Sequence, residues 1–163
     1  MYYDLLSAVD RQVAISGTAV YQIEELNVPD SIVVADMKFA VVKVSENAFR
    51  YNRNISKVHL PDAINEIGNE AFKECYNLRE INLPDAITKI GQEAFSECRL
   101  LKSVHFPESL LEIGSKAFYY CTGLENIILN SKVTTIWGAA FLGFGSAKSI
   151  WIPKTVEVGG YAF

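Results

Sequence analysis

The chain has 163 residues, half of them hydrophobic, and a formal net charge of −4, so it can fold into one well-packed domain and is too apolar for a disordered chain. The mild negative charge and the lack of a basic stripe exclude an electrostatic nucleic-acid binder, and no apolar run reaches the length of a membrane-spanning helix. Residues 1–17 lack the basic start and apolar middle of a secretory signal. We therefore expect no nucleic-acid binding and no membrane insertion, in a protein that is either intracellular or given without its leader.

Residues 1–22 are expected to form an N-terminal capping hairpin. Two short apolar stretches, Tyr2 to Leu6 and Val13 to Ser16, flank the polar sequence Asp10-Arg11-Gln12. This pattern is compatible with two strands joined by a turn. Such a hairpin would cover the open end of a stack of repeats, which a repeat protein needs to protect from solvent.

The first repeat is longer than those that follow it. It begins at Ile23, and its stretch from Pro29 to Val44 covers 15 residues where the next repeat has 6. The additional residues alternate in hydrophobicity around Asp36-Met37, which predicts two extra short strands. We therefore place a solenoid over residues 23–163, with about six coils, an elaborated first coil and an incomplete last coil.

From Val44 onward the sequence repeats itself at an offset of 23 residues, with one step of 22 before the last repeat. The offset aligns one column of branched aliphatic residues and one column of phenylalanines that each follow an alanine. The aliphatic column consists of Val44, Ile67, Ile90, Ile113, Ile136 and Val158. The aromatic column consists of Phe49, Phe72, Phe95, Phe118, Phe141 and Phe163. A fixed period of this length predicts a solenoid, because one repeat cannot bury its apolar side without neighbours.

Each repeat has three parts, which the copy from Leu78 to Cys98 illustrates. The segment from Leu78 to Pro84 alternates in hydrophobicity and ends at a proline, which predicts a short strand. A second extended piece ends at Ile90-Gly91, where glycine allows the chain to turn a corner. The last part places Phe95 and Cys98 three residues apart, which predicts a single helical turn or a short helix. Stacked coils would align the strands in a parallel sheet with a spacing of about 4.8 Å.

The combined pattern resembles the BspA-type leucine-rich repeat family, whose coils read roughly L-x-x-I-x-L-P-x-x-I-x-x-I-G-x-x-A-F-x-x-C. The resemblance covers Ile23 to Phe163. It implies an α/β repeat solenoid: a right-handed leucine-rich-repeat horseshoe with a parallel concave β-sheet and short helical turns on the convex side. The departures from the pattern are Asn52 and Phe144 at the cysteine position, Asn130 at the proline position and Trp137 at the glycine position.

The resemblance also implies a function, although a fold alone does not determine one. It implies a non-catalytic protein-interaction module, part of a bacterial cell-surface or secreted protein with adhesin-like binding through the concave sheet. The alternatives are a structural or spacer solenoid that displays or joins other domains, and self-association through an open C-terminal edge. The expected partner is a protein or peptide, and no cofactor is expected.

Strand alternation assigns two columns of side chains to the outer side of the concave sheet. The first column is polar and consists of Lys57, Glu80, Ser103, Asn126 and Ser149. The second column changes from polar to apolar and consists of His59, Asn82, His105, Ile128 and Trp151. Ile128 and Trp151 exposed together would form a small apolar patch of the kind that protein interfaces use, unless a further coil or domain covers them. We predict these ten residues as candidate protein-binding residues.

The cysteines and histidines do not indicate a metal site. Cys75, Cys98 and Cys121 share one core-facing repeat position, and we expect buried thiols that pack as small apolar groups. Zinc sites group their ligands on adjacent loops, and no C-x-x-C sequence is present. His59 and His105 lie two coils apart, roughly 9–10 Å by the strand spacing. This is too far for one metal ion, whose nitrogen ligands lie about 2.1 Å away.

No combination of residues predicts an enzyme. No serine, histidine and acid converge by column, and no glycine-rich phosphate loop follows a strand. The glutamates of the third part are assigned to solvated helix faces rather than to acid–base chemistry. They are Glu70, Glu74, Glu93 and Glu97.

Overall fold

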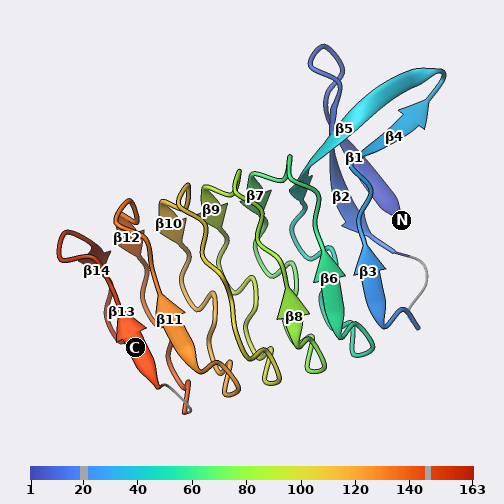
Figure 1. Cartoon of the computed structure of the whole chain (residues 1–163). Helices are drawn as coiled ribbons and strands as arrows, with labels where there is room; N and C mark the ends of the chain where they lie inside the picture. The colour runs from blue at the N-terminus through green and yellow to red at the C-terminus, as the bar shows by residue number, and fades with distance from the viewer. Residues whose placement is uncertain (19–21, 146–147) are drawn as a thin grey trace.

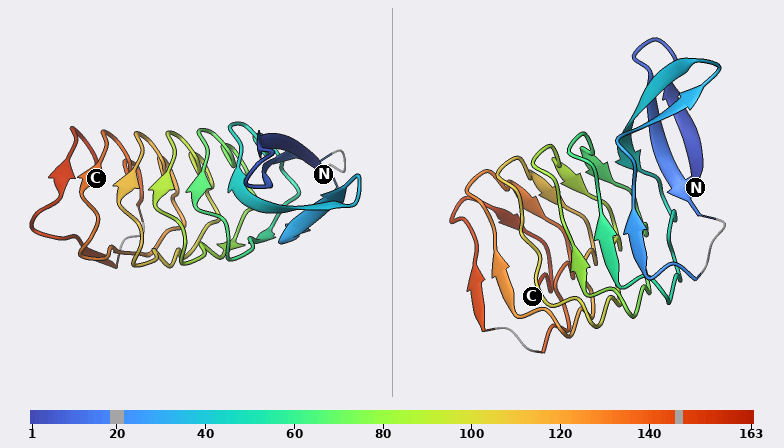
Figure 2. Two further views of the ribbon diagram at one scale, coloured as in Figure 1. Left: turned by 90° about the horizontal axis from the view of Figure 1, so that it is seen from above. Right: turned by 45° about the vertical axis from the view of Figure 1, so that its right-hand side comes forward.

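A computed structural model describes residues 1–18, 22–145 and 148–163. Ala147, which the repeat pattern places at the start of the last strand segment, lies outside the described residues, as do residues 19–21 of the expected hairpin region. The chain forms a row of stacked coils, and two hairpins stand at its N-terminal end (Figures 1 and 2). The described residues form strands and turns and contain no helix.

The first strand of each coil lies on the side of the stack that faces the viewer in Figure 1, which we call the front face. One parallel sheet on this face contains β3 (Glu25–Asn27), β6 (Lys57–His59) and β8 (Glu80–Ile81), and a second contains β11 (Asn126–Ile128) and β13 (Ser149–Trp151). Each residue pairs with its equivalent in the next repeat. This register is the stacking that the repeat spacing predicts.

The expected single sheet on the front face is interrupted at one coil. Residues 101–106 form no strand, and the backbone N–H groups of residues 103–106 make no hydrogen bond with other described residues. Phe106 occupies the position that is leucine in the neighbouring coils, and its ring packs edge-on against Phe118 and Phe141 at centroid distances of 5.5 and 6.2 Å. We attribute the interruption to this larger ring, because it requires more room than leucine beneath the strand.

The second extended pieces form a longer parallel ladder on the adjacent side of the coils. Its strands are β7 (Glu66–Ile67), β9 (Lys89–Ile90), β10 (Glu112–Ile113), β12 (Thr135–Ile136) and β14 (Glu157–Val158). The isoleucine of each strand is fully buried, as the repeat column predicts, whereas Val158 in β14 is 46% exposed.

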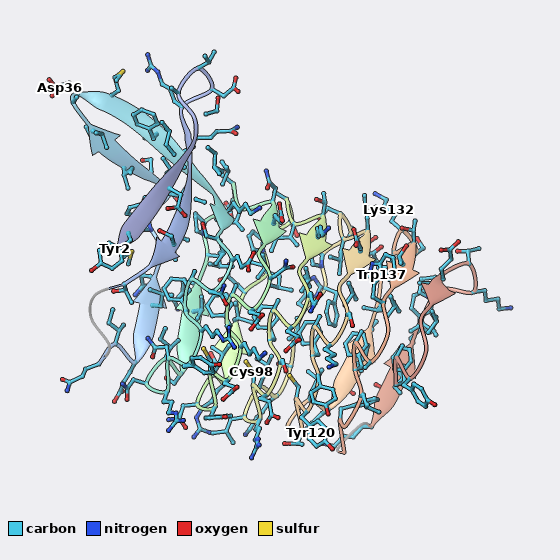
Figure 3. The ribbon with its side chains drawn as sticks, turned by 180° about the vertical axis from the view of Figure 1, so that it is seen from behind. Tyr2, Asp36, Cys98, Tyr120, Lys132 and Trp137 are labelled. Atoms are coloured by element: carbon cyan, nitrogen blue, oxygen red, sulfur yellow. The ribbon has the colours of Figure 1, made fainter. Side chains whose placement is uncertain are left out.

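Two antiparallel hairpins precede the regular coils. β1 (Tyr2–Ser7) pairs with β2 (Gln12–Gly17), and β4 (Ser31–Val34) pairs with β5 (Met37–Val44). β2 also pairs in parallel with β5, so the first hairpin continues the second ladder. The β4–β5 turn consists of Ala35 and Asp36, whose φ angles are 49° and 61°. Positive φ at both residues is what a two-residue type I′ turn requires, and Asp36 lies at the tip of this hairpin (Figure 3).

The prediction of helical turns on the far side of each coil is wrong, because these segments are series of β-turns. Between Gly91 and Cys98, every second N–H group bonds to the carbonyl three residues earlier, and the intervening N–H groups reach carbonyls of the next coil. The glutamates assigned to helix faces have φ angles between 53° and 64°, in the left-handed region. A right-handed α-helix does not contain this conformation. These glutamates are Glu70, Glu74, Glu93 and Glu97.

The phenylalanines form one continuous stack through the core. From Phe49 to Phe163, the centroids of successive rings lie 5.1–5.4 Å apart, and the ring planes are within 14° of parallel. The inner four rings are completely buried. The ring spacing is close to the distance between parallel strands, so aromatic packing and backbone pairing support the same separation of coils.

The three cysteines are free, buried thiols next to this stack. The Sγ atoms of Cys75, Cys98 and Cys121 each donate a hydrogen bond of 3.1–3.2 Å to the carbonyl of the phenylalanine in the preceding coil. Figure 3 shows Cys98 among the coils. Burial raises the pKa of the Cys75 thiol to about 12 and also raises the pKa values of Cys98 and Cys121. The thiols therefore stay protonated at neutral pH and pack as the small apolar groups that we expected.

The two asparagines that depart from the repeat are buried with satisfied hydrogen bonds. Asn52, at a cysteine position, accepts a bond from the N–H of Ile55 at 3.2 Å. Asn130, at a proline position, donates to the carbonyl of Pro107 at 2.5 Å and accepts from the N–H of Lys132 at 2.7 Å. Because both amides are bonded, neither departure leaves a buried polar group without a partner.

A partly buried charge network joins three of the turns. The Nζ atom of Lys73 lies 2.5 Å from a carboxylate oxygen of Glu93 and 3.1 Å from one of Glu70, and Arg50 contacts the same oxygen of Glu70 at 2.9 Å. The hydrogen bond to Glu93 raises the pKa of Lys73 although burial opposes this. Burial would raise the pKa of Glu93, but the hydrogen bond and the charge of Lys73 lower it overall.

We expect the contribution of this network to stability to disappear at both ends of the pH scale. The lowered pKa of Glu93 contributes stability above about pH 4.5, and this is lost as the pH falls through the folded-state value. The raised pKa of Lys73 contributes stability below about pH 10.5, and this is lost as the pH rises through the folded-state value. At pH 7, Lys73→Met should lower the free energy of unfolding by about 1 kcal/mol.

Urea unfolding of the parent and of Lys73→Met between about pH 3 and about pH 11 measures this effect. The difference in unfolding free energy between the two proteins should be largest in the middle of the range and should shrink at each end. Lys154→Met, at an exposed lysine, is the control. A difference that stays constant across the range would contradict the prediction.

Candidate interaction surface on the front face

Nine of the ten residues predicted from strand alternation lie in the front-face strands or in the interrupted segment between them, and Asn82 lies one residue after β8 ends. Seven are exposed, and three are partly buried. The partly buried residues are Lys57, His59 and Asn126. The inward residues from Val58 to Ile127 that alternate with them are at most 8% exposed, whereas Ile150 in β13 is 46% exposed. The expected alternation of exposed and buried side chains therefore holds up to β11 and is lost in β13, and the role of the ten residues in binding stays a prediction.

Three polar contacts link these side chains across adjacent coils. They join Lys57 to Glu80 at 3.4 Å, His59 to Glu25 at 2.9 Å, and Ser149 to Asn126 at 2.7 Å. Exposed ion pairs contribute only about 0–1 kcal/mol. A ligand can therefore replace such contacts at little cost in stability.

Asn82 uses its side chain within the fold. Its Oδ1 accepts a hydrogen bond of 2.8 Å from the N–H of Leu60, and its Nδ2 donates one of 3.0 Å to the carbonyl of the same residue. Asn82 lies one residue after β8 ends. Its side-chain amide therefore replaces the backbone groups with which a longer neighbouring strand would bond the N–H and the carbonyl of Leu60. The hydrogen-bonding groups of Asn82 are already engaged, which makes it a weaker contact candidate than its neighbours.

The side chains of Ser103, His105, Ile128 and Trp151 make no hydrogen bond or ion pair with another described residue. Ile128 and Trp151 lie opposite each other in register, and they are 61% and 52% exposed. We call these two residues the apolar patch. They line a shallow groove of about 610 Å³ together with Glu108 and Ser149. Exposed tryptophan beside a large aliphatic residue is typical of the energetic centre of a protein interface.

A second groove of about 500 Å³ crosses the N-terminal half of the front face. Lys57, Arg79 and Lys102 contribute cationic groups to its lining, and Glu80 contributes the carboxylate that pairs with Lys57. We call it the basic groove. The whole chain carries a net charge of −4, so this groove is a positive region on a negative protein. His105 and His59 also line it.

Sequence reasoning did not identify Arg79 or Lys102, because both come just before the outward strand positions that alternation selects. The signal that could have found them is their repeat position: they are 23 residues apart and therefore lie in adjacent coils. Within the described part of the chain, no group of three His, Cys, Asp or Glu side chains could hold a metal ion. What the surface offers a partner is hydrogen bonding, charge and apolar contact.

The stacked coils, the parallel ladders and the repeated Phe column define the class of protein as a leucine-rich repeat solenoid with an exposed strand face. The family model for the BspA type leucine-rich repeat region matches residues 42–163 in six copies. The chain belongs to the BspA-type leucine-rich repeat family. Repeat solenoids of this kind generally bind other proteins through extended surfaces and are not enzymes.

Three solved bacterial structures share this fold. A leucine-rich repeat protein from T. pallidum has a TM-score of 0.82 and 24% identity, over 97% of this chain and 82% of that one. A leucine-rich repeat protein from Bacteroides ovatus has a TM-score of 0.78 and 28% identity, over 99% of this chain and 48% of that one. A leucine rich cell surface protein from Faecalibacterium prausnitzii has a TM-score of 0.86 and 23% identity, over 99% of this chain and 43% of that one.

This chain therefore spans less than half the length of the last two proteins. A search of the curated proteins found no match. Among the described residues, no helix has the length and apolar character needed to cross a membrane. The similarity to the solved structures confirms the leucine-rich repeat fold that the sequence predicts.

Proposed function

We propose that the chain is a protein-interaction module whose front face binds a protein or peptide segment. The observation that carries this proposal is the apolar patch, in which Ile128 and Trp151 are exposed side by side on a ladder of strands. Large apolar side chains in such a position are costly to leave in water and favourable to cover with a partner. The basic groove and the unpaired Ser103 and His105 supply polar contacts on the same face.

We place the module in a bacterial cell-surface or secreted protein, with adhesin-like binding as its role. Two names among the structural relatives support this: the cell surface protein from F. prausnitzii and the pneumococcal vaccine antigen PcpA, which matches over 97% of this chain at 22% identity. Antibody labelling of intact source cells tests the location. Labelling that requires permeabilised cells would contradict it.

Trp151→Ala is expected to weaken binding through the front face by at least about tenfold, because buried tryptophans dominate interface energies. Peptides from a phage-displayed random library, selected on the immobilised chain, serve as probes. Tyr161→Ala is the matched control, since Tyr161 is 84% exposed and lies outside the front-face strands. Both variants should melt close to the parent. If selected peptides bind the parent and Trp151→Ala equally well, the front face is not the binding surface.

A spacer role is the alternative, and the continuous phenylalanine stack favours it because such a stack makes a stiff rod. A spacer would yield no peptide whose binding depends on Trp151. Self-association at the edge formed by β13 and β14 stays a prediction. Sedimentation of the parent at tens of micromolar measures it, and a monomer at that concentration would contradict it.

A further inference from the structure

Resting on this proposed function, we infer the chemistry of the occupant: an extended peptide segment with acidic residues at one end and a large apolar side chain at the other. The acidic end would lie in the basic groove against Arg79 and Lys102. The apolar end would lie on the apolar patch formed by Ile128 and Trp151. The inference combines two features of the front face that lie several coils apart.

The basic groove has cationic groups without an ion pair in the fold, although the pKa of Glu125 in the next coil is lowered by its bond to Lys148 and, to a smaller extent, by the charge of Lys102. Arg79 and Lys102 are exposed and form no ion pair with another described residue. Lys57 is paired at 3.4 Å with Glu80, which supplies the only carboxylate among the described residues that line the groove. Three cations therefore face one carboxylate. A ligand carboxylate can form a two-point hydrogen bond with the Arg79 guanidinium while Lys102 adds charge from the next coil.

The charges at the opposite edge of the front face give the bound segment an orientation. Asp62, Asp85 and Glu108 follow the strand prolines in three successive coils and are all exposed. They repel a carboxylate from the edge where the strands end. Acidic ligand groups are thus directed toward Arg79 and Lys102, at the edge where the strands begin.

The distance between the two features determines how the acidic and apolar residues of the ligand are spaced. The coils that carry Arg79 and Trp151 are three steps apart, and each step is close to the 5.1–5.4 Å that separates successive phenylalanine rings. Three steps make about 15 Å along the stack, and Trp151 lies three positions further along its strand than Arg79, about 10 Å at 3.3 Å per residue. The resulting diagonal is about 18 Å from Arg79 and about 14 Å from Lys102, which is one coil nearer, so the acidic residues should lie four to six positions from the apolar one.

Selection from a random peptide library on the parent chain tests the inference directly. Enriched peptides should contain aspartate or glutamate about four to six positions from an aromatic or large aliphatic residue. Synthetic versions of these peptides should lose at least about tenfold in affinity on the double variant Arg79→Glu/Lys102→Glu, and their affinity should fall as salt rises. The matched control is Lys38→Glu/Lys116→Glu, which reverses two exposed lysines outside the front-face strands and both grooves and should leave binding unchanged.

Three other outcomes would overturn the inference in distinguishable ways. Neutral or basic peptides that still require Trp151 would overturn the acidic specificity and leave the proposed function standing. The lack of any peptide that requires Trp151 would overturn the proposed function, and the inference with it. Binding of a heparin oligosaccharide that displaces the peptides and is tighter than theirs would assign the basic groove to an acidic polysaccharide instead.

Discussion

Phe95→Ala is expected to lower the free energy of unfolding by about 3–5 kcal/mol, the usual cost of removing a buried aromatic ring. The Phe95 ring is fully buried and stacks on Phe72 at 5.4 Å and on Phe118 at 5.1 Å. Its loss removes two ring contacts and leaves a cavity that the neighbouring coils cannot fill, because backbone pairing already fixes their separation. Denaturant unfolding followed by circular dichroism measures the change.

Trp151→Ala is the control for Phe95→Ala, because Trp151 is 52% exposed and lies outside the phenylalanine stack. It should change the free energy of unfolding by less than about 1 kcal/mol. Since the total stability of a domain is about 5–15 kcal/mol, Phe95→Ala should also melt at a visibly lower temperature. A variant that melts within error of the parent would show that the stack does not support the core.

Gly114→Ala is expected to cost about 1–3 kcal/mol through overpacking. A Cβ atom at Gly114 would lie 2.5 Å from the carbonyl carbon of Gly91, 2.6 Å from the backbone nitrogen of Gln92 and 2.7 Å from the carbonyl oxygen of Gly91. These atoms belong to the backbone of the preceding coil, so no side chain can move aside to relieve the clash. The added methyl group must push two coils apart where their backbones meet.

Gly160→Ala is the matched control, because nothing lies within 4 Å of a Cβ atom at that position. It should leave the free energy of unfolding within about 0.5 kcal/mol of the parent. Thermal and urea unfolding of both variants measure the comparison. Equal stability of Gly114→Ala and Gly160→Ala would mean that the coils are not in close backbone contact at Gly114.

The sequence predicted the repeated elements better than their local conformation. The spacing between Phe95 and Cys98 is the same on one face of a short helix and in a series of β-turns, so periodicity over so few residues could not separate the two. The hydrogen bonds of the structure distinguish the two and show a series of β-turns. The N–H groups of Glu93, Phe95 and Glu97 bond to carbonyls of the next coil, and such partners are visible only when two coils are placed side by side.

Only part of the candidate surface could be predicted from the sequence, because some of its features arise only when coils stack. Alternation identified Ile128 and Trp151, because a strand places every second side chain on the same side. It could not identify the basic groove, since Arg79 and Lys102 precede the strand positions and come together only when coils stack. It also could not show that Asn82 is already bonded to Leu60 in the preceding coil.

The spacing of the repeats was enough to predict that the coils stack and that the phenylalanine and isoleucine columns lie inside. Identical apolar positions in short repeats can leave water only by packing on one another. The place where the front sheet is interrupted followed from the tertiary structure, because the Phe106 ring packs against Phe118 and Phe141 of other coils. Which surface groups are paired also followed from it, because their partners come from adjacent coils and not from the same repeat.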